Sequence, residues 1–209
     1  MKLFLKTLGV VAAIFLIILA VSAAIYFPGH NMRTLDEGRF LGSRQMNAVN
    51  LDHTIGVLDV RTVINLRGEN PGSDWYDAEV AVCKERKVPL HSFAWSKNKI
   101  PDPESLARYI NVIETGTPPF LAHCQGGTHR TGVAAAVYLL LKGKDIATAR
   151  KQFGPMFLNA PIGKLLDLYE GSGMPFKQWA LEVYPGVYAE LQKKTAPAGD
   201  APAPAPAAG

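Results

Sequence analysis

The chain has 209 residues, and its 22 Lys and Arg against 18 Asp and Glu give a net charge of +4 at neutral pH. This length suits one globular domain with a sizeable core and short appendages. The positive charge is modest and forms no basic run, so it gives no case for nucleic-acid binding and mildly favours anionic substrates. The cysteines Cys83 and Cys124 make no zinc motif, because neither has a second Cys or a His at ligand spacing.

An uncharged stretch near the N-terminus predicts a membrane span. Residues 8–29 contain no charged side chain, and these 22 residues are enough for a helix across a hydrocarbon core of about 30 Å. A cleaved secretory signal is the competing interpretation, since residues 21–23 end in the small side chains that signal peptidase accepts. The apolar stretch is longer than that of most cleaved signals and continues into Tyr26 and Phe27, which suit a membrane interface. We therefore expect an uncleaved signal anchor.

Positive charges predict the orientation of this span. Lys2 and Lys6 precede it and place the N-terminus in the cytoplasm by the positive-inside rule. Arg33 and Arg39 follow the span and weaken that bias without reversing it. We expect the folded domain on the non-cytoplasmic side, which is the periplasm if the source is a Gram-negative bacterium.

The chain divides into four parts on composition. Residues 1–7 form a short cytoplasmic N-terminus, and residues 8–29 form the anchor. Residues 30–194 carry the alternating pattern of a folded domain. Residues 195–209 are rich in Pro and Ala with no large apolar side chain to bury, which predicts a disordered, extended tail.

Within the folded part, short apolar runs alternate with helical patterns. The strands are expected at residues 60–66, 88–95 and 120–122. The helices are expected at residues 47–58, 75–86, 103–114 and 131–141, with three more around 145–153, 161–170 and 175–192. This alternation predicts an α/β domain in which helices flank a central, mainly parallel sheet.

Capping residues and apolar faces support the individual helices. Asp102 before Pro103 is typical of a helix start, with Asp at the N-cap and Pro at the first helical position. Ser73 or Asp74 can cap the preceding helix. The side chains expected to face inward are Tyr76, Val80 and Cys83 in the earlier helix, and Leu106, Ile110 and Ile113 in the later one.

The most informative segment is residues 120–132, FLAHCQGGTHRTG. It is a strand, then a cysteine, then a glycine-rich turn, then an arginine that opens a helix. Glycines let the backbone curl so that successive N–H groups point into one hollow, and the helix N-terminus adds its dipole. Such a cradle fits a tetrahedral oxyanion, and its positive potential would lower the pKa of Cys124 below the free value of about 8.5. Arg130 could grip two oxygens in bidentate fashion, as Lys could not.

This segment resembles the His-Cys-x-x-Gly-x-x-Arg-Thr signature of the cysteine-based tyrosine and dual-specificity protein phosphatases. The matching positions are His123, Cys124, Gly127, Arg130 and Thr131. A bare Cys-x5-Arg would be weak, but the flanking His, glycines and Thr-Gly between a strand and a helix make the match specific. Residues 63–132 are also similar to compact bacterial dual-specificity phosphatases and the related plant and fungal group, with weaker likeness at 40–43 and 153. A Cys124 that only packs in the core would leave the glycines and the arginine unexplained.

The resemblance implies a role for each residue of the loop. Cys124 attacks phosphorus and carries a phospho-enzyme intermediate, and Thr131 corresponds to the hydroxyl that hydrogen-bonds the cysteine sulfur. The equatorial oxygens are stabilised by the Arg130 side chain and by the backbone N–H groups of the loop. The phosphate-binding residues are Gln125, Gly126, Gly127, Thr128, His129 and Arg130. His123 either holds the loop from behind or is a core histidine. No metal or organic cofactor is implied.

The chain departs from the family pattern at the general acid. The family supplies an upstream Asp that protonates the leaving oxygen, and that position falls in residues 96–99, which contain no Asp. Asp102 is the nearest carboxylate and our candidate acid, although its role as helix N-cap competes. The further candidates are Glu69, Asp74, His91 and His129.

Two functions from different classes remain open. The first is a membrane-anchored phosphatase that acts on phosphotyrosine or phosphoserine in proteins or on a small phosphorylated substrate. The alternative is a membrane-tethered pseudophosphatase that binds phosphorylated ligands without turnover, which the missing Asp motivates and the intact nucleophile opposes. A sulfurtransferase is less favoured, because the Arg at the sixth position and the Thr-Gly after it favour phosphate. The loop lacks lysines, so a highly charged inositol substrate is also less favoured.

The second cysteine also has two interpretations. Cys83 lies on the inward stripe of its predicted helix, so core packing is expected. A regulatory disulfide between Cys83 and Cys124 is the alternative in an oxidising compartment.

Overall fold

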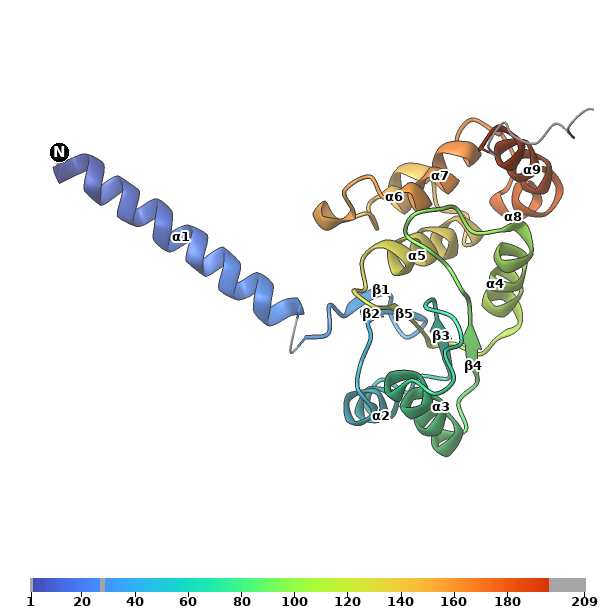
Figure 1. Cartoon of the computed structure of the whole chain (residues 1–209), viewed down its shortest axis with the longest axis horizontal. Helices are drawn as coiled ribbons and strands as arrows, with labels where there is room; N and C mark the ends of the chain where they lie inside the picture. The colour runs from blue at the N-terminus through green and yellow to red at the C-terminus, as the bar shows by residue number, and fades with distance from the viewer. Residues whose placement is uncertain (1, 27–28, 196–209) are drawn as a thin grey trace, which may run out of the picture.

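The computed structural model describes residues 2–26 and 29–195 of the chain (Figure 1). The tail expected from residue 195 lies outside the described residues except for Thr195, which ends the last helix. Helix α1, Lys2–Tyr26, contains the predicted span and stands apart from the remaining elements (Figure 1). Its stretch Lys6–Ala24 is long and apolar enough to cross a membrane, with a mean hydropathy of 2.6 and no burial against the domain. A signal sequence would have the same properties, so α1 by itself does not distinguish an anchor from a cleaved signal.

A five-stranded sheet in the order β1-β2-β5-β3-β4 forms the centre of the domain. The strands are β1 Arg33–Asp36, β2 Phe40–Arg44, β3 Thr62–Asn65, β4 Leu90–Ser92 and β5 Phe120–Cys124. The pairings β2–β5, β5–β3 and β3–β4 are parallel, whereas β1 pairs antiparallel with β2. The α/β prediction is confirmed, and the sheet is mixed because of an edge hairpin that the sequence analysis did not foresee.

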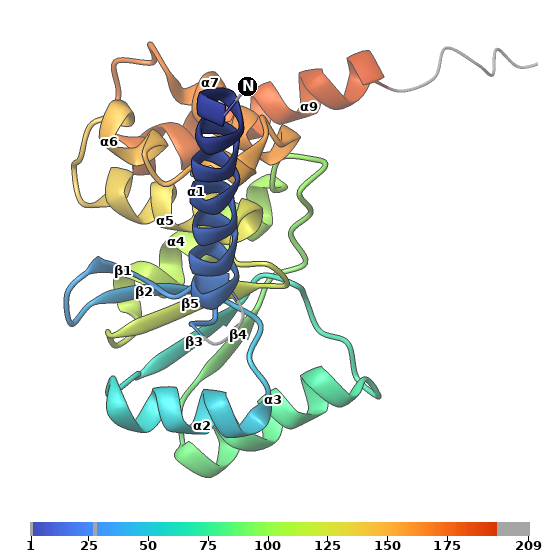
Figure 2. The same cartoon turned by 90° about the vertical axis from the view of Figure 1, so that its left-hand side faces the viewer.

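Helices cover both faces of the sheet (Figure 2). On one face lie α2 Ala48–Val57 and α3 Asp74–Arg86. On the other lie α4 Pro103–Thr115, α5 His129–Leu141, α6 Ile146–Arg150, η1 Pro155–Phe157, η2 Pro161–Gly163, α7 Lys164–Tyr169, α8 Phe176–Gln178, η3 Trp179–Val183 and α9 Tyr184–Thr195. The predicted helix at 175–192 is therefore one helical run with a π-helical turn, η3, inside it.

Side chains of β5 alternate between two hydrophobic cores, as the pleat of a strand buried on both faces requires. Phe120, Ala122 and Cys124 belong to the core under α4 and α5, and Leu121 belongs to the core under α2 and α3. Cys83 lies in the second of these cores, and both cysteines are free thiols. The disulfide alternative is therefore wrong for this fold, because the sheet separates the two sulfur atoms.

The caps and faces of the helices match the sequence analysis at α4 and only in part at α3, where Ser73 is at the N-cap but its side chain makes no capping hydrogen bond. Asp102 caps α4 by accepting a hydrogen bond from the backbone N–H of Ser105 at 2.8 Å. The expected inward side chains of α4 are all buried, namely Leu106, Ile110 and Ile113. On α3 the expected stripe is wrong at Val80, which is 39% exposed while its neighbour Glu79 is buried; Cys83 is buried and Tyr76 half-buried as part of that face. The buried Glu79 carboxylate has a partner on β5, the imidazole of His123.

Candidate active site

The predicted cradle forms where β5 meets α5. Cys124 is the last residue of β5, and its side chain is only 3% exposed. The turn Gln125–Thr128 follows, and α5 begins at His129, which places Arg130 in the first helical turn. The thiol therefore lies at the base of a loop that ends in a helix N-terminus, the arrangement that favours an anion.

Gly127 allows the loop to curl tightly against β2. Its φ of +71° lies in the left-handed region, which residues with a side chain rarely adopt. A Cβ atom at this position would lie 2.7 Å from the backbone nitrogen of Arg44 and 2.8 Å from the carbonyl carbon of Ser43. Only glycine fits here, and the consequence is that the loop packs directly on the backbone of the neighbouring strand.

The surroundings of Cys124 favour its thiolate. Burial by itself raises the pKa of this thiol, but several groups more than offset that effect. The hydroxyl and the backbone N–H of Thr131 favour the thiolate most, although this hydroxyl also lies 3.4 Å from the carbonyl oxygen of Ser43; the charge of Arg130 and the N–H of Gly127 add to the effect. The pKa of Cys124 is therefore lowered from its ordinary value, as a thiolate nucleophile requires. Burial and the nearby Glu79 instead raise the pKa of Cys83 to about 12.

Backbone carbonyls hold the guanidinium of Arg130 at the mouth of the cradle. Its Nη1 atom donates to the carbonyl oxygen of Leu66 at 3.2 Å and to that of Trp95 at 3.4 Å. These carbonyls follow β3 and β4, so three loops at the carboxyl edge of the sheet converge on this side chain. No carboxylate forms an ion pair with Arg130 among the described residues. Its positive charge is free to meet an anionic substrate.

A buried polar network lies behind the loop. Nε2 of His123 is 2.7 Å from Oε1 of Glu79, and the other oxygen of Glu79 accepts from Nε2 of Gln45 at 2.9 Å. Oε1 of Gln45 accepts in turn from Arg67 at 3.1 Å, and the Arg67 guanidinium stacks over Trp75 at 3.5 Å. Sequence analysis left His123 open between a support behind the loop and a core histidine, and it missed Glu79, Gln45 and Arg67. The signal for Glu79 was an acidic side chain on an otherwise apolar helix face.

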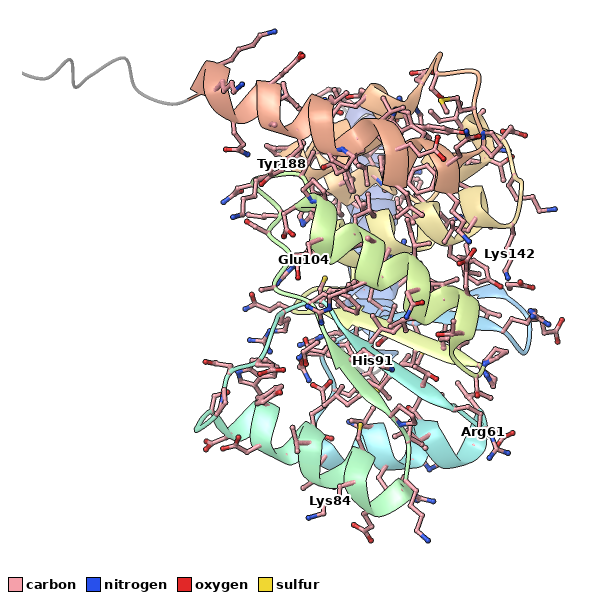
Figure 3. The ribbon with its side chains drawn as sticks, turned by 90° about the vertical axis from the view of Figure 1, so that its right-hand side faces the viewer. Arg61, Lys84, His91, Glu104, Lys142 and Tyr188 are labelled. Carbon is pink, nitrogen blue, oxygen red and sulfur yellow. The ribbon has the colours of Figure 1, made fainter. Side chains whose placement is uncertain are left out.

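The candidate acids are dispersed over the domain. Asp102 is engaged in the cap of α4, while Glu69 and Asp74 are exposed in and after the loop that follows β3. His91 lies on the edge strand β4 (Figure 3), and burial followed by the charge of Arg108 lowers its pKa. Burial and the charge of Lys97 lower the pKa of His129. Among the described residues, no hydrogen bond joins any of these groups to Cys124 or to the Arg130 side chain.

The comparison with protein-family models identifies the domain. Residues 30–161, well over half of the chain, match the model described as "Swiss Army Knife protein, DSP-PTPase phosphatase domain". This chain belongs to that family. The DSP-PTPase domain is a phosphatase of the dual-specificity and tyrosine phosphatase type, in agreement with the resemblance seen in the loop. No curated protein sequence gives a significant match to the chain.

Solved structures share the fold of this DSP-PTPase domain. The core catalytic domain of the PP-IP phosphatase SIW14 from S. cerevisiae, in complex with citrate, is 16% identical, with a TM-score of 0.55 over 78% of this chain and 92% of that chain. A putative phosphatase (DUF442) from Shewanella putrefaciens is 17% identical, with a TM-score of 0.51 over 65% and 85% of the two chains. TpbA from P. aeruginosa is 20% identical, with a TM-score of 0.50 over 62% and 75%.

Proposed function

We propose that this domain hydrolyses phosphate monoesters through a phosphocysteine intermediate on Cys124, with Arg130 binding the transferred phosphoryl group. The observation that carries the proposal is the environment of Cys124. A buried thiol with a lowered pKa lies at the base of a glycine turn, below an arginine that no carboxylate neutralises among the described residues. A core cysteine would need none of these features.

The reaction would proceed in two displacements. In the first, the Cys124 thiolate attacks phosphorus, the S–P bond forms and the P–O bond to the leaving group breaks. The leaving oxygen takes a proton from an acid or from water, while Arg130 and the N–H groups of residues 125–130 hold the equatorial oxygens. In the second, water attacks phosphorus, the S–P bond breaks, and the Thr131 hydroxyl stabilises the departing thiolate.

The first displacement needs a general acid for the leaving oxygen. We retain Asp102 as the candidate, because it is the carboxylate nearest in sequence to the position that the family uses. A phenol is a better leaving group than an alkyl alcohol and needs the acid less. A TpbA variant has been crystallised in complex with phosphotyrosine. Phosphotyrosyl proteins and small aryl phosphates are therefore the substrates we propose first.

We also propose that α1 anchors the enzyme in a membrane and that residues 30–194 form the catalytic domain on the non-cytoplasmic side. The uncharged stretch of α1 and the lysines before it support this arrangement.

Turnover of p-nitrophenyl phosphate by the full chain in detergent, under reductant, tests the proposal. The comparison is with Cys124→Ser, and Cys83→Ala is the control for loss of a buried thiol elsewhere. We expect turnover in the parent and in Cys83→Ala, and none in Cys124→Ser. If the folded parent binds phosphate without turning over any aryl phosphate, the pseudophosphatase alternative is correct instead.

A further inference from the structure

The outward carbonyls of the phosphate loop have donors from the chain segment that directly follows α1. Nδ2 of Asn31 donates to the carbonyl oxygen of Gly126 at 3.0 Å, and Nη2 of Arg33 donates to that of Gly127 at 2.8 Å. When successive N–H groups of a loop point into a hollow, its carbonyls must point away and need partners of their own. Donors on these two carbonyls therefore fix the direction in which the neighbouring N–H groups point.

The β1–β2 hairpin places Arg33 next to the loop. This arginine pairs across the hairpin with Gly42, where a Cβ would touch the Arg33 side chain at 3.9 Å and crowd Cγ2 of Thr131 at 3.0 Å. Nη1 of Arg33 also donates to the carbonyl oxygen of Gln152 at 3.2 Å, which ties the loop to the segment after α6. Within the described part of the chain, no acidic side chain forms an ion pair with Arg33.

The charge of Arg33 acts on the nucleophile. Burial lowers the pKa of Arg33, and the negative charge of Cys124 raises it, which is an attraction between the guanidinium and the thiolate. The attraction also favours the thiolate, but less than the hydrogen bonds of Thr131 and the charge of Arg130, which dominate at Cys124. Arg33 thus combines two hydrogen bonds to backbone carbonyls with a positive charge that attracts the Cys124 thiolate.

We propose that Asn31 and Arg33 are positioning residues for catalysis: they orient the backbone of Gly126 and Gly127 toward the phosphate, and Arg33 adds a second cation beside Cys124. This inference rests on the proposed phosphatase mechanism and extends it to a segment outside the signature loop. Asn31 follows the end of α1 at Tyr26 by five residues, a stretch of at most about 18 Å of extended chain. The same short segment therefore connects the apolar helix to the phosphate loop.

The test compares Arg33→Met and Arg33→Lys in the full chain in detergent, with Arg61→Met as the control. Arg61 lies at the edge of the domain (Figure 3), where it is paired with Asp59 and 56% exposed. Two quantities are measured: the pH dependence of Cys124 alkylation by iodoacetamide, and kcat and KM for p-nitrophenyl phosphate. Alkylation needs no turnover, so a failure of this inference is distinguishable from a failure of the proposed function.

In Arg33→Met we expect kcat to fall about tenfold or more and the alkylation pKa of Cys124 to rise. Arg33→Lys keeps the positive charge but cannot donate to the carbonyl oxygens of Gly127 and Gln152 at the same time. Its alkylation pKa should therefore be closer to that of the parent than the alkylation pKa of Arg33→Met is, while its kcat stays reduced. Arg61→Met should behave as the parent in both measurements. The inference is overturned if folded Arg33→Met has the parental alkylation profile and kcat, or if Lys restores the pKa no better than Met.

Asn31→Ala is the second variant, for the case in which Arg33→Met does not fold. It removes one hydrogen bond to the loop and no charge, and it places Ala at a φ of +46°, so its stability is measured alongside kcat. We expect kcat to fall about fivefold, the effect of losing one hydrogen bond, with the alkylation pKa unchanged. Parental kcat in folded Asn31→Ala would overturn the positioning role of this segment.

Discussion

Nε2 of His123 lies 2.7 Å from Oε1 of Glu79, and both side chains are buried directly behind the phosphate loop. His123 precedes the nucleophile on β5, while Glu79 comes from α3, 44 residues earlier in the chain. The pair therefore connects the back of the loop to a helix on the opposite face of the sheet. Glu79 also accepts from Gln45, so its removal would take a partner from the buried His123 and from the half-buried Gln45.

Glu79→Ala should lower the free energy of unfolding by about 3 kcal/mol or more, because a broken buried pair leaves its partners desolvated and unsatisfied. Denaturant unfolding of the variant and the parent measures this difference. Glu85→Ala is the control on the same helix, since Glu85 is exposed. Equal unfolding midpoints for Glu79→Ala and Glu85→Ala would show that the buried pair contributes little to stability.

Gly127→Ala should lower kcat about 100-fold, because displacement of the loop by even about 1 Å misplaces its N–H groups. The added methyl group would contact the backbone of Ser43 and Arg44. Gly143→Ala is a matched control, because Gly143 has a φ of +73° with no atom within 4 Å of the added Cβ. Both variants impose the same backbone strain, and only Gly127→Ala adds the clash. Similar kcat values for the two variants would contradict this account of the loop.

Alkylation of the native protein should modify Cys124 and leave Cys83 unmodified at neutral pH. The pKa of Cys124 is lowered, so its thiolate is present below the ordinary thiol range, whereas the pKa of Cys83 is raised to about 12. The rate of Cys124 alkylation should rise with pH through the lowered pKa, and Thr131→Val should move this rise to higher pH by removing the hydroxyl donor. Peptide mass spectrometry identifies the modified residue. Preferential alkylation of Cys83, or a Thr131→Val profile equal to that of the parent, would contradict the assigned electrostatics.

Asp102→Asn separates the two roles of that residue, because Asn caps a helix about as well as Asp but cannot donate the proton. If Asp102 is the general acid, turnover of an alkyl phosphate should fall about 100-fold and that of p-nitrophenyl phosphate much less. Asp145→Asn is the control, since Asp145 caps α6 through the same contact, to the N–H of Thr148. If Asp102→Asn turns over both substrates at the parental rate, Asp102 is only a helix cap and not the general acid.

The full chain should remain in the membrane fraction after extraction with alkaline carbonate, because the apolar stretch Lys6–Ala24 is long enough to span the bilayer. A variant that lacks residues 2–26 should be released into the soluble fraction. A soluble mature protein whose N-terminus begins near residue 24 would instead establish a cleaved signal.

The catalytic loop was predictable from the sequence because its parts are consecutive. The strand, the cysteine, the glycine turn and the helix start lie within residues 120–132, and each has a local signature. The cap at Asp102 and the inward face of α4 were predictable for the same reason.

The supports of the loop were not predictable, because they act through contacts between distant segments. Arg33 reaches Gly127 across 94 residues and Gln45 reaches Glu79 across 34, and nothing local in the sequence distinguishes these side chains from solvated ones. The β1–β2 hairpin was missed because β1 has four residues, two of them charged. Gly38, with its φ of +64°, was the one local sign of a turn between the strands.

The most direct test of the central claim is to trap the phospho-enzyme. The full chain is mixed briefly with a phosphotyrosyl peptide under reductant and quenched in acid, and its tryptic peptides are analysed by mass spectrometry. We predict a phosphate on the peptide that carries Cys124, absent from Cys124→Ser and lost with time as water attacks. A parent enzyme that releases phosphate while no cysteine is ever labelled, or a Cys124→Ser variant that turns over at the parental rate, would contradict the phosphocysteine mechanism.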